Sequence, residues 1–343
     1  MNPWPAVVGI CSAMCADEEV RRRKAEKRRH VLERCTSGDI RMVKEYRRSA
    51  AGVDLCNSRH LRTIEALLMT SDYLIDNILD RKDVSWPVVY EFVADRFRSI
   101  LQDITIQRLC CETTAGIVLR CLRFFIYAGY RLGTSWPGFQ AKLNGDMIQQ
   151  CISQLLFCYD GSSVHSCRCQ NEWAEFAAIY LLYNLDSSEP CLYILSQPTK
   201  RRQHPLISLA FKIFLAKTTR NYVRFFRLVD QLPAACLSCA IHRHVKKFHR
   251  LALKVMNTGY SMKNCLYPLK NLATILALES EEEAGALCAE HGIEVKEGSA
   301  IFQKGSYQES SKKDPLSRYS FIDKFLTDDV KIFDIIKGHF SKK

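Results

Sequence analysis

The apolar residues of segment 86–108 recur at the spacing of an α-helix, and this segment constrains the fold more than any other. The residue at position 87 is proline, which suits the first turn of a helix because its missing N–H has no partner to lose. The apolar residues are separated by three, one, four, three, one and three positions, which places them on one helix face. They are Val89, Phe92, Val93, Phe97, Ile100, Leu101 and Ile104. We therefore predict a long helix that packs its apolar face against other helices.

Four charged residues are interleaved with this apolar face: Asp95, Arg96, Arg98 and Asp103. Two interpretations are open. Charges on a helix usually face solvent, where Asp95 and Arg98, three positions apart, can pair along the surface. Alternatively, the four residues form a partly buried network of arginines and aspartates that fixes neighbouring helices. A catalytic role is disfavoured, because no histidine or nucleophile stands nearby in the sequence.

Helical periodicity continues through most of the chain. Residues 17–34 predict a basic helix that opens with three acids, which suit a helix N-terminus. Further helical patterns cover 61–82, 86–108, 112–132, 145–159, 171–186, 206–217, 219–231 and 235–257. We expect a mainly α fold in which successive antiparallel helices form a right-handed helical stack.

The pattern changes after residue 260. Residues 268–278 and 281–290 predict two helices, and 293–296 and 300–304 alternate as a β-hairpin around Glu297-Gly298-Ser299. Helix, helix, hairpin is the order of a winged helix. We therefore divide the chain into 1–56, an N-terminal signature and basic helix, 57–260, the helical stack, 261–327, the winged helix, and 328–343, a C-terminal tail.

The composition is typical of a folded chain with reduced thiols. The 16 cysteines are scattered, no N-x-Ser/Thr acceptor is present, and the apolar stretch near the start precedes its basic run, the reverse of a signal peptide. No apolar run approaches the ~18 residues of a membrane span, so we expect no membrane insertion.

The excess positive charge is concentrated in residues 196–256, which hold thirteen Lys/Arg and one acid, Asp230. Two stripes at helical spacing, on consecutive helices, carry most of it. The first comprises Lys217, Arg220, Arg224 and Arg227, and the second Arg243, Lys246, Lys247, Arg250 and Lys254. Together they could form one patch that binds nucleic-acid phosphates or an acidic protein, or simply faces solvent. Lys304, Lys312 and Lys313 are a weaker, secondary basic contact, because their region is acidic overall.

Enzyme and metal-binding motifs are missing or poorly formed. The sequence has no P-loop, dinucleotide-binding, zinc-protease or nucleophile-elbow motif. Cys236, Cys239, His242 and His244 suggest zinc, but four tetrahedral ligands would crowd into nine residues. We expect cysteines that pack a helix, histidines at the surface, no metal, no cofactor and no enzyme activity.

Five segments together resemble the Sac-three/GANP family. Residues 92–107 are similar to its signature helix, and Gly9-Ile10-Cys11-Ser12-Ala13-Met14-Cys15 to its opening G-T-C-P-D-M-C, although Ile10, Ser12 and Ala13 depart from it. Residues 43–52, 221–229 and 291–293 are similar to its V-K-E-Y, N-x-V-R-F-F and H-G-L segments.

The resemblance implies a PCI-type, non-catalytic scaffold. Such scaffolds pair with another PCI-domain subunit and a small acidic subunit, and act in messenger-RNA export at the nuclear pore. RNA is a further candidate partner, through the basic stripes. The chain is most similar to the short Sac-three-domain-containing members, which are associated with centrosome duplication and the spindle. We therefore expect a scaffold at the centrosome, spindle and nucleus, with export at the pore as the alternative.

Overall fold

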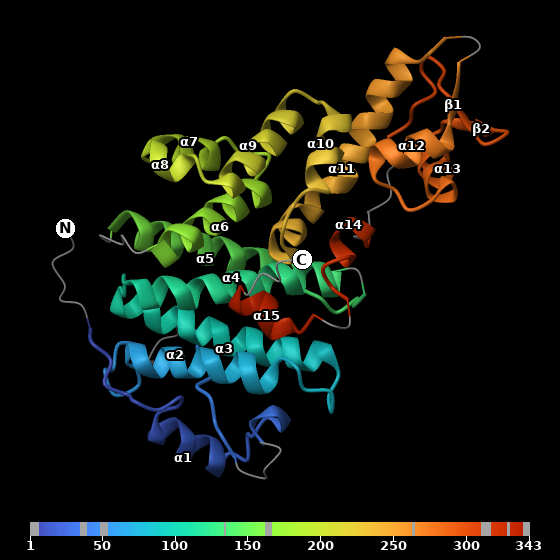
Figure 1. Ribbon diagram of the computed structural model, residues 1–343. Coiled ribbons are helices and arrows are strands. Elements are labelled where there is room, and N and C mark those ends of the chain that lie inside the picture. The colour runs from blue at the N-terminus through green and yellow to red at the C-terminus, as the bar shows by residue number, and fades with distance from the viewer. Residues whose placement is uncertain are drawn as a thin grey trace. The chain divides into compact units, whose positions relative to one another are not determined.

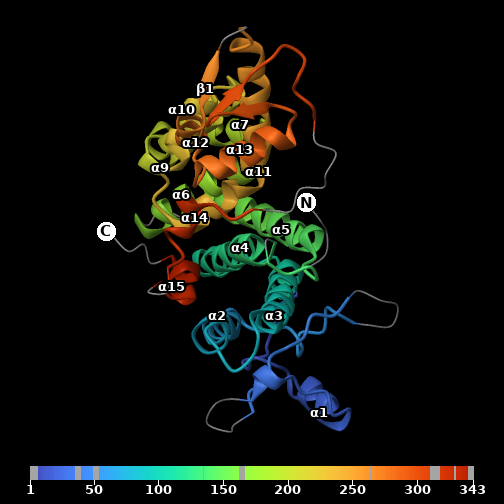
Figure 2. The ribbon, with the colours of Figure 1, turned by 90° about the vertical axis from the view of Figure 1, so that its right-hand side faces the viewer.

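The computed structural model describes residues 7–34, 40–48, 54–133, 135–161, 167–262, 265–309, 317–327 and 330–338, and is mainly helical (Figures 1 and 2). The chain forms two compact units. The first unit comprises Met1–Leu132, Trp136–Glu172 and Val330–Lys343. The second comprises Gly133–Ser135 and Trp173–Asp329. The predicted mainly α class is confirmed.

The first unit is built from long helices that succeed one another in layers (Figures 1 and 2). Its elements are α1 (Asp17–Ala25), the 3-10 turn η1 (Val31–Glu33), α2 (Ile64–Tyr73), the π turn η2 (Leu74–Ile78), α3 (Trp86–Gln107), α4 (Glu112–Gly133), α5 (Ala141–Gly161), the first turns of α6 (Cys167–Tyr183) and α15 (Ile332–Lys337).

The core of the first unit lies along α3 and α4. Proline in the first turn starts α3, and Arg108, in the left-handed conformation with φ 53°, ends it. The predicted apolar face is buried, and its Phe97 ring meets Phe124 of α4 edge-on at 5.1 Å between centroids. The helix expected at 86–108 is therefore confirmed.

The basic helix expected at 17–34 is wrong in its second half. α1 ends at Ala25, and Lys27 takes a left-handed φ of 54°, which breaks the helix. A separate 3-10 turn follows at 31–33, where His30 accepts from the Leu32 N–H and Glu33 accepts from the His30 N–H. This break turns the Glu33 carboxylate back toward α1, where it meets Arg23 at 2.5 Å.

The second unit begins with shorter helices and ends with a small sheet. Its elements are the rest of α6, α7 (Glu189–Ser196), α8 (Thr199–Arg202), α9 (Pro205–Thr218), α10 (Tyr222–Val229), α11 (Ala235–Gly259), β1 (Leu266–Pro268), α12 (Leu269–Leu276), α13 (Glu281–Glu290), β2 (Glu294–Lys296), β3 (Ser299–Ile301) and α14 (Ser320–Asp323). The sequence patterns did not predict α7 and α8.

The sheet of the second unit is antiparallel, with strand order β1-β3-β2. The expected hairpin is confirmed as β2 and β3, joined by Glu297 and Gly298, whose φ angles of 47° and 70° suit a tight hairpin turn. The pairing of β1 with β3, Leu266 opposite Ile301, was not predicted. Both helices expected before the hairpin, α12 and α13, are present.

Candidate binding surfaces

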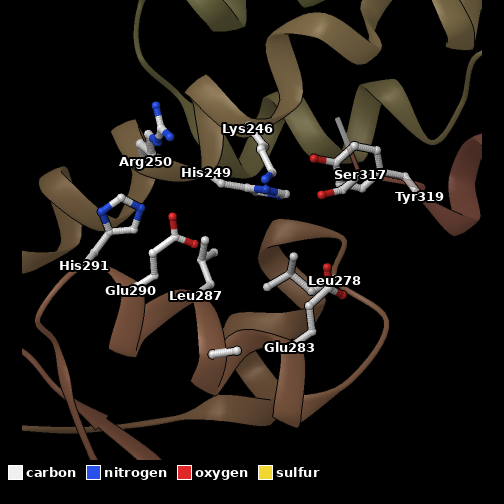
Figure 3. A pocket seen from close by; sticks show the side chains of 11 residues that line it. Lys246, His249, Arg250, Leu278, Glu283, Leu287, Glu290, His291, Ser317 and Tyr319 are labelled. Atoms are coloured by element: carbon white, nitrogen blue, oxygen red, sulfur yellow. The ribbon is translucent and has the colours of Figure 1, made fainter. Parts of the chain in front are cut away.

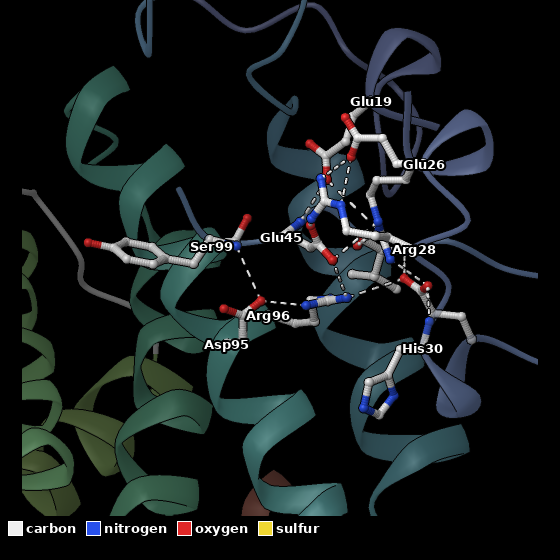
Figure 4. Close-up of polar contacts among 12 residues, drawn as sticks. Glu19, Glu26, Arg28, His30, Glu45, Asp95, Arg96 and Ser99 are labelled. Atoms are coloured by element: carbon white, nitrogen blue, oxygen red, sulfur yellow. Dashed lines mark hydrogen bonds and ion pairs between the residues drawn. The ribbon is translucent and has the colours of Figure 1, made fainter. Parts of the chain in front are cut away.

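A buried charged network surrounds Arg96 of α3 and joins it to the N-terminal segment (Figure 4). Arg23 is fully buried, and its two terminal nitrogens reach the Glu33 carboxylate at 2.5 Å and the Val43 carbonyl at 3.0 Å. Arg96 reaches the other Glu33 oxygen at 3.3 Å and also pairs with Asp95. Two guanidinium groups thus share one buried carboxylate.

The charge on Glu33 is favoured despite its burial. Burial alone raises the pKa of this carboxyl, but the hydrogen bond and charge of Arg23, the Val43 N–H and Arg96 outweigh it, so the pKa lies below its ordinary value. Glu33 is therefore anionic at neutral pH and holds α1, the segment around residue 43 and α3 together.

A second network centres on Asp103, which has no exposed surface. One carboxylate oxygen accepts from Lys44 Nζ at 2.6 Å, and the other accepts from Arg62 Nε at 2.7 Å. Arg62 also donates to Ser99 Oγ at 2.8 Å. Of the two interpretations, a solvated face is therefore wrong for Asp103 and Arg96, because both are buried in networks.

The networks fix N-terminal segments to α3 more than they fix neighbouring helices. Asp95 is half-buried and accepts from the Tyr46 N–H at 3.2 Å. Arg98 lies over the Tyr46 ring, 4.0 Å from its centroid, and this contact differs from the Asp95–Arg98 pair that the spacing suggested. The partners Arg23, Glu33, Lys44 and Arg62 were not identified from the sequence, because no periodicity connects them with α3.

The first basic stripe lies on the outer side of α10. Asn221 caps this helix by accepting from the Arg224 N–H at 3.0 Å, so the helix begins three residues later than predicted. Arg220 stands outside it, in a left-handed conformation with φ 54°. Arg220, Arg224 and Arg227 are all exposed, whereas Lys217 lies in α9 and pairs with Asp186 at 3.0 Å.

The second stripe follows α11, and several of its members contact other elements. Arg243 lies over the Tyr183 ring at 4.5 Å, Lys247 pairs with Asp186 at 3.1 Å, and Lys254 pairs with Glu309 at 3.1 Å. Lys246 and Arg250 border a cavity of about 170 Å³ between α11 and α13 (Figure 3). Glu283 and Glu290 stand on its opposite side, so this cavity has a mixed-charge rim.

The structure does not merge the two stripes into one patch. Phe225 of α10 stacks on Phe248 of α11 with centroids 4.0 Å apart, and Phe226 stacks on His249 at 4.8 Å. Successive helical residues turn by about 100°, so on each helix the basic side chains lie roughly opposite these aromatic contacts. α10 and α11 therefore carry two cationic surfaces that face away from each other.

The secondary basic contact is only partly described. Lys304 is exposed, three residues after β3 ends. Lys312 and Lys313 lie outside the described residues. Lys304 is therefore the one member of this set that the structure places.

The histidines expected at the surface are buried, so that expectation is wrong. His242 donates from Nε2 to the Ser317 carbonyl at 3.0 Å, and His244 to the Tyr183 carbonyl at 2.9 Å. Burial lowers the pKa of each imidazole to about 4, although those carbonyls favour the charged form. Cys236 and Cys239 are buried as well. Among the described residues no three His, Cys, Asp or Glu side chains gather as a metal site would require.

No helix in the described part of the chain has the length and apolar character needed to cross a membrane. Arginines interrupt the apolar residues of the long helix α4. Arg123 is buried, and Arg120 pairs with Asp72 at 2.7 Å.

Comparison with known protein families identifies the family to which the chain belongs. The family model described as SAC3/GANP family matches residues 14–297. The chain belongs to the SAC3/GANP family. The matched span includes both buried networks and both basic stripes, whereas Lys304 lies beyond it.

Several SAC3/GANP relatives are similar over most of this chain. Protein xmas of Drosophila melanogaster is 28% identical over 312 residues, 86% of this chain and 15% of that protein. SAC3 family protein B of Arabidopsis thaliana is 26% identical and covers 84% of this chain and 18% of that protein. SAC3 family protein 1 of Schizosaccharomyces pombe is 26% identical, and the match covers 84% of this chain and 30% of that protein. The chain thus spans less than a third of the length of these relatives.

Proposed function

We propose that this chain is a non-catalytic scaffold of the SAC3/GANP type. The observation that carries the proposal is the family match over residues 14–297, which covers every charged surface described above except Lys304. In the first unit, the charged residues of the Arg96 and Asp103 networks are buried and stabilise the fold. Arg224 and Arg227 on α10, and Arg243, Lys247 and Lys254 on α11, are exposed, so a partner can reach their charges.

We infer a PCI-like architecture, in which the helical stack of 57–260 is followed by a winged helix at 261–327. The order β1, α12, α13, β2, β3 and the three-stranded antiparallel sheet support this inference. Residues 1–56 then form the N-terminal signature region and 328–343 the C-terminal tail. Because the family resemblance implies pairing with another PCI-domain subunit, we infer that the winged helix binds that subunit.

A small acidic subunit is the partner that the α10 stripe suits best. Arg224 and Arg227 are exposed on one face, and guanidinium groups bind carboxylates with two hydrogen bonds. This scaffold acts in centrosome duplication, spindle assembly and mitotic progression, at the centrosome, the spindle and the nucleus. The likeness to the Sac-three-domain-containing members supports this assignment.

The second candidate is messenger-RNA export in a transcription-export complex at the nuclear pore, with direct RNA binding. The α11 stripe favours it, because Arg243, Lys246, Lys247, Arg250 and Lys254 follow one helix line as phosphate contacts do. Such contacts give affinity without sequence preference, and the affinity falls steeply with salt.

Proximity labelling in dividing cells tests the proposal. Because the two stripes face apart, each is reversed separately: Arg224→Glu with Arg227→Glu on α10, and Arg243→Glu with Lys247→Glu on α11. Lys142→Glu, at an exposed lysine of α5 outside both stripes and the winged helix, is the matched control. Centrosomal and spindle neighbours that are lost with the α10 variant alone support the role in centrosome duplication and spindle assembly.

The same experiment can also favour messenger-RNA export over the centrosomal role, or contradict the scaffold proposal. Pore neighbours, together with RNA that co-purifies at low salt and is lost with the α11 variant, would establish the export role. Unchanged neighbours in both variants would contradict a scaffold that works through these stripes. Turnover of any substrate, abolished by one polar substitution, would contradict the non-catalytic assignment.

A further inference from the structure

Two leucines of α7 are exposed to solvent, although the opposite side of this helix is buried. Leu192 is 63% exposed and Leu195 is 48% exposed, and they share one helix face because they are three positions apart. On the other side of α7, Pro190 and Ile194 are buried, and Tyr193 OH lies 3.2 Å from Trp173 Nε1 of α6. The exposed leucines are thus presented on a rigid support.

A third exposed leucine lies on the neighbouring helix α9. Leu215 of α9 is 48% exposed and lies three positions after Lys212, which is exposed on the same side. Lys217 donates to the Leu185 carbonyl at 2.9 Å, which holds the end of α9 against the loop before α7. Figure 1 shows α7, α8 and α9 next to one another.

The charge around these leucines is mainly positive. Residues 189–220 contain six Lys/Arg and one acid, Glu189, which is exposed in the first turn of α7. Between α7 and α9, no residue of α8 is buried, and Lys200 is exposed. Arg201 instead turns inward over the Trp173 ring, 5.3 Å from its centroid. An apolar surface with mainly positive charge near it complements a partner that is both apolar and acidic.

We propose that α7, α8 and α9 dock an acidic amphipathic helix of a protein partner. We call Leu192, Leu195, Lys200, Lys212 and Leu215 the α7–α9 surface. The partner's leucines, spaced at three and four positions, cover the three exposed leucines, and its flanking Asp and Glu meet Lys200 and Lys212. This surface is separate from the stripes on α10 and α11, so the proposal does not depend on the function of those stripes.

A protein helix is favoured over a lipid surface. Helices that lie in a membrane interface present a long apolar face, usually with tryptophan or phenylalanine among the inserted residues. α7 has eight residues, and its exposed large apolar residues are two leucines. Such a small, rigid surface suits the side chains of one helical segment.

Fluorescence anisotropy with a defined probe tests the proposal on the full chain. The probe is a fluorescein-labelled peptide of about 18 residues, or about five helical turns, with leucines along one face and glutamates elsewhere. We expect saturable binding that weakens with salt. Leu192→Ser with Leu195→Ser should weaken it by at least about tenfold, because each leucine contributes on the order of 1 kcal/mol by burial.

Two controls make the result specific. Leu266→Ser removes a leucine of similar exposure, 57%, from β1 and should leave the affinity unchanged. A scrambled peptide of the same composition should bind at least about tenfold more weakly, because its leucines no longer share a face. Circular dichroism confirms that each variant retains the helical content of the parent chain.

Three outcomes would overturn the proposal. The first is no binding of the probe up to about 100 µM at low salt, a limit near 5 kcal/mol of binding free energy. The second is equal binding by the Leu192→Ser, Leu195→Ser variant. The third is co-sedimentation with vesicles of phosphatidylserine and phosphatidylcholine, without peptide binding, which would make the surface a membrane contact.

Discussion

Arg62 and Asp103 form an ion pair in which neither side chain has exposed surface, with Arg62 Nε 2.7 Å from Asp103 Oδ2. Desolvating two charges costs several kcal/mol each, and good geometry with additional hydrogen bonds is needed to offset that cost. Lys44 and Ser99 provide those bonds here. The pair therefore joins the segment that precedes α2 to the last two turns of α3, while Nη1 of Arg62 is buried without a hydrogen-bond partner.

Replacing Asp103 by asparagine should destabilise the chain strongly. The substitution keeps the shape but leaves Arg62 and Lys44 as buried cations without a countercharge, which costs roughly 3–5 kcal/mol. Urea unfolding followed by circular dichroism measures the loss of free energy. Asp83→Asn is the matched control, because Asp83 pairs with Arg81 while more than half exposed. It should cost far less than Asp103→Asn, because solvent screens an exposed ion pair. Equal losses for the two variants would contradict the buried network.

Gly338→Ala should loosen α15. Gly338 has φ 77°, and an added Cβ would lie 2.5 Å from Arg123 Nη2. The clash would displace the Arg123 side chain, which holds α15 by donating to the Ile336 carbonyl at 3.1 Å. The left-handed backbone alone costs about 1–2 kcal/mol for alanine, and the clash adds to it. Hydrogen exchange of residues 332–337 should become faster.

Gly305→Ala separates the two contributions to this effect. Gly305 has φ 84°, but nothing lies within 4 Å of its added Cβ, so only the backbone cost remains. We expect a smaller loss of stability for Gly305→Ala than for Gly338→Ala. The same loss for both would show that the contact with Arg123 does not matter.

Ala277→Gly should stabilise the second unit. Ala277 ends α12 with φ 53° and ψ 42°, a conformation in which alanine is strained and glycine is not. The relief of strain exceeds the added entropy of the unfolded chain, for a net gain of roughly 0.5 kcal/mol. Thermal unfolding should show a higher midpoint. Ala286→Gly, inside α13 at an exposed position, should instead cost about 1 kcal/mol. A loss at both positions would contradict the prediction.

Stability should fall as the pH drops from about 6.5 toward 4. Burial lowers the pKa of His242, His244 and His249 to about 4, whereas an unfolded histidine titrates near 6.5. Between these values the unfolded state binds more protons, so the free energy of unfolding rises with pH and is lost on acidification. Each histidine contributes up to about 1.4 kcal/mol per pH unit.

Urea unfolding at several pH values between 5 and 6.5 checks this expectation. His249→Gln should reduce the slope by about one third, since one of three histidines no longer titrates. At pH 7.5 the slope should be small for both proteins, which serves as the internal control. A parent chain whose stability is constant from pH 6.5 to 5 would contradict the buried, neutral histidines.

The sequence predicted the elements whose burial is periodic. The apolar steps of α3 and the alternation of β2 and β3 are local patterns, and a single helix or hairpin satisfies them. α7 and α8 escaped prediction because α7 is apolar on its exposed side as well, so Leu192 and Leu195 show no contrast with Ile194.

Site predictions depended on contacts between distant segments and were less complete. Arg224 and Arg227 of α10 are exposed, as their spacing predicted, but the separation of the α10 and α11 stripes follows from the stacking of Phe225 on Phe248, which no spacing encodes. His242 and His244 appeared polar enough for the surface, yet a backbone carbonyl satisfies each ring in the interior. Arg23 and Glu33 became partners through the break at Lys27.

The position of α15 has a consequence for how the protein is made. A chain leaves the ribosome from its N-terminus, yet the helix that Arg123 and Asp76 hold in the first unit is encoded after the whole second unit. The first unit therefore begins to fold early and is finished last. A message cut short just before codon 332 would yield a complete second unit and a first unit lacking its final helix.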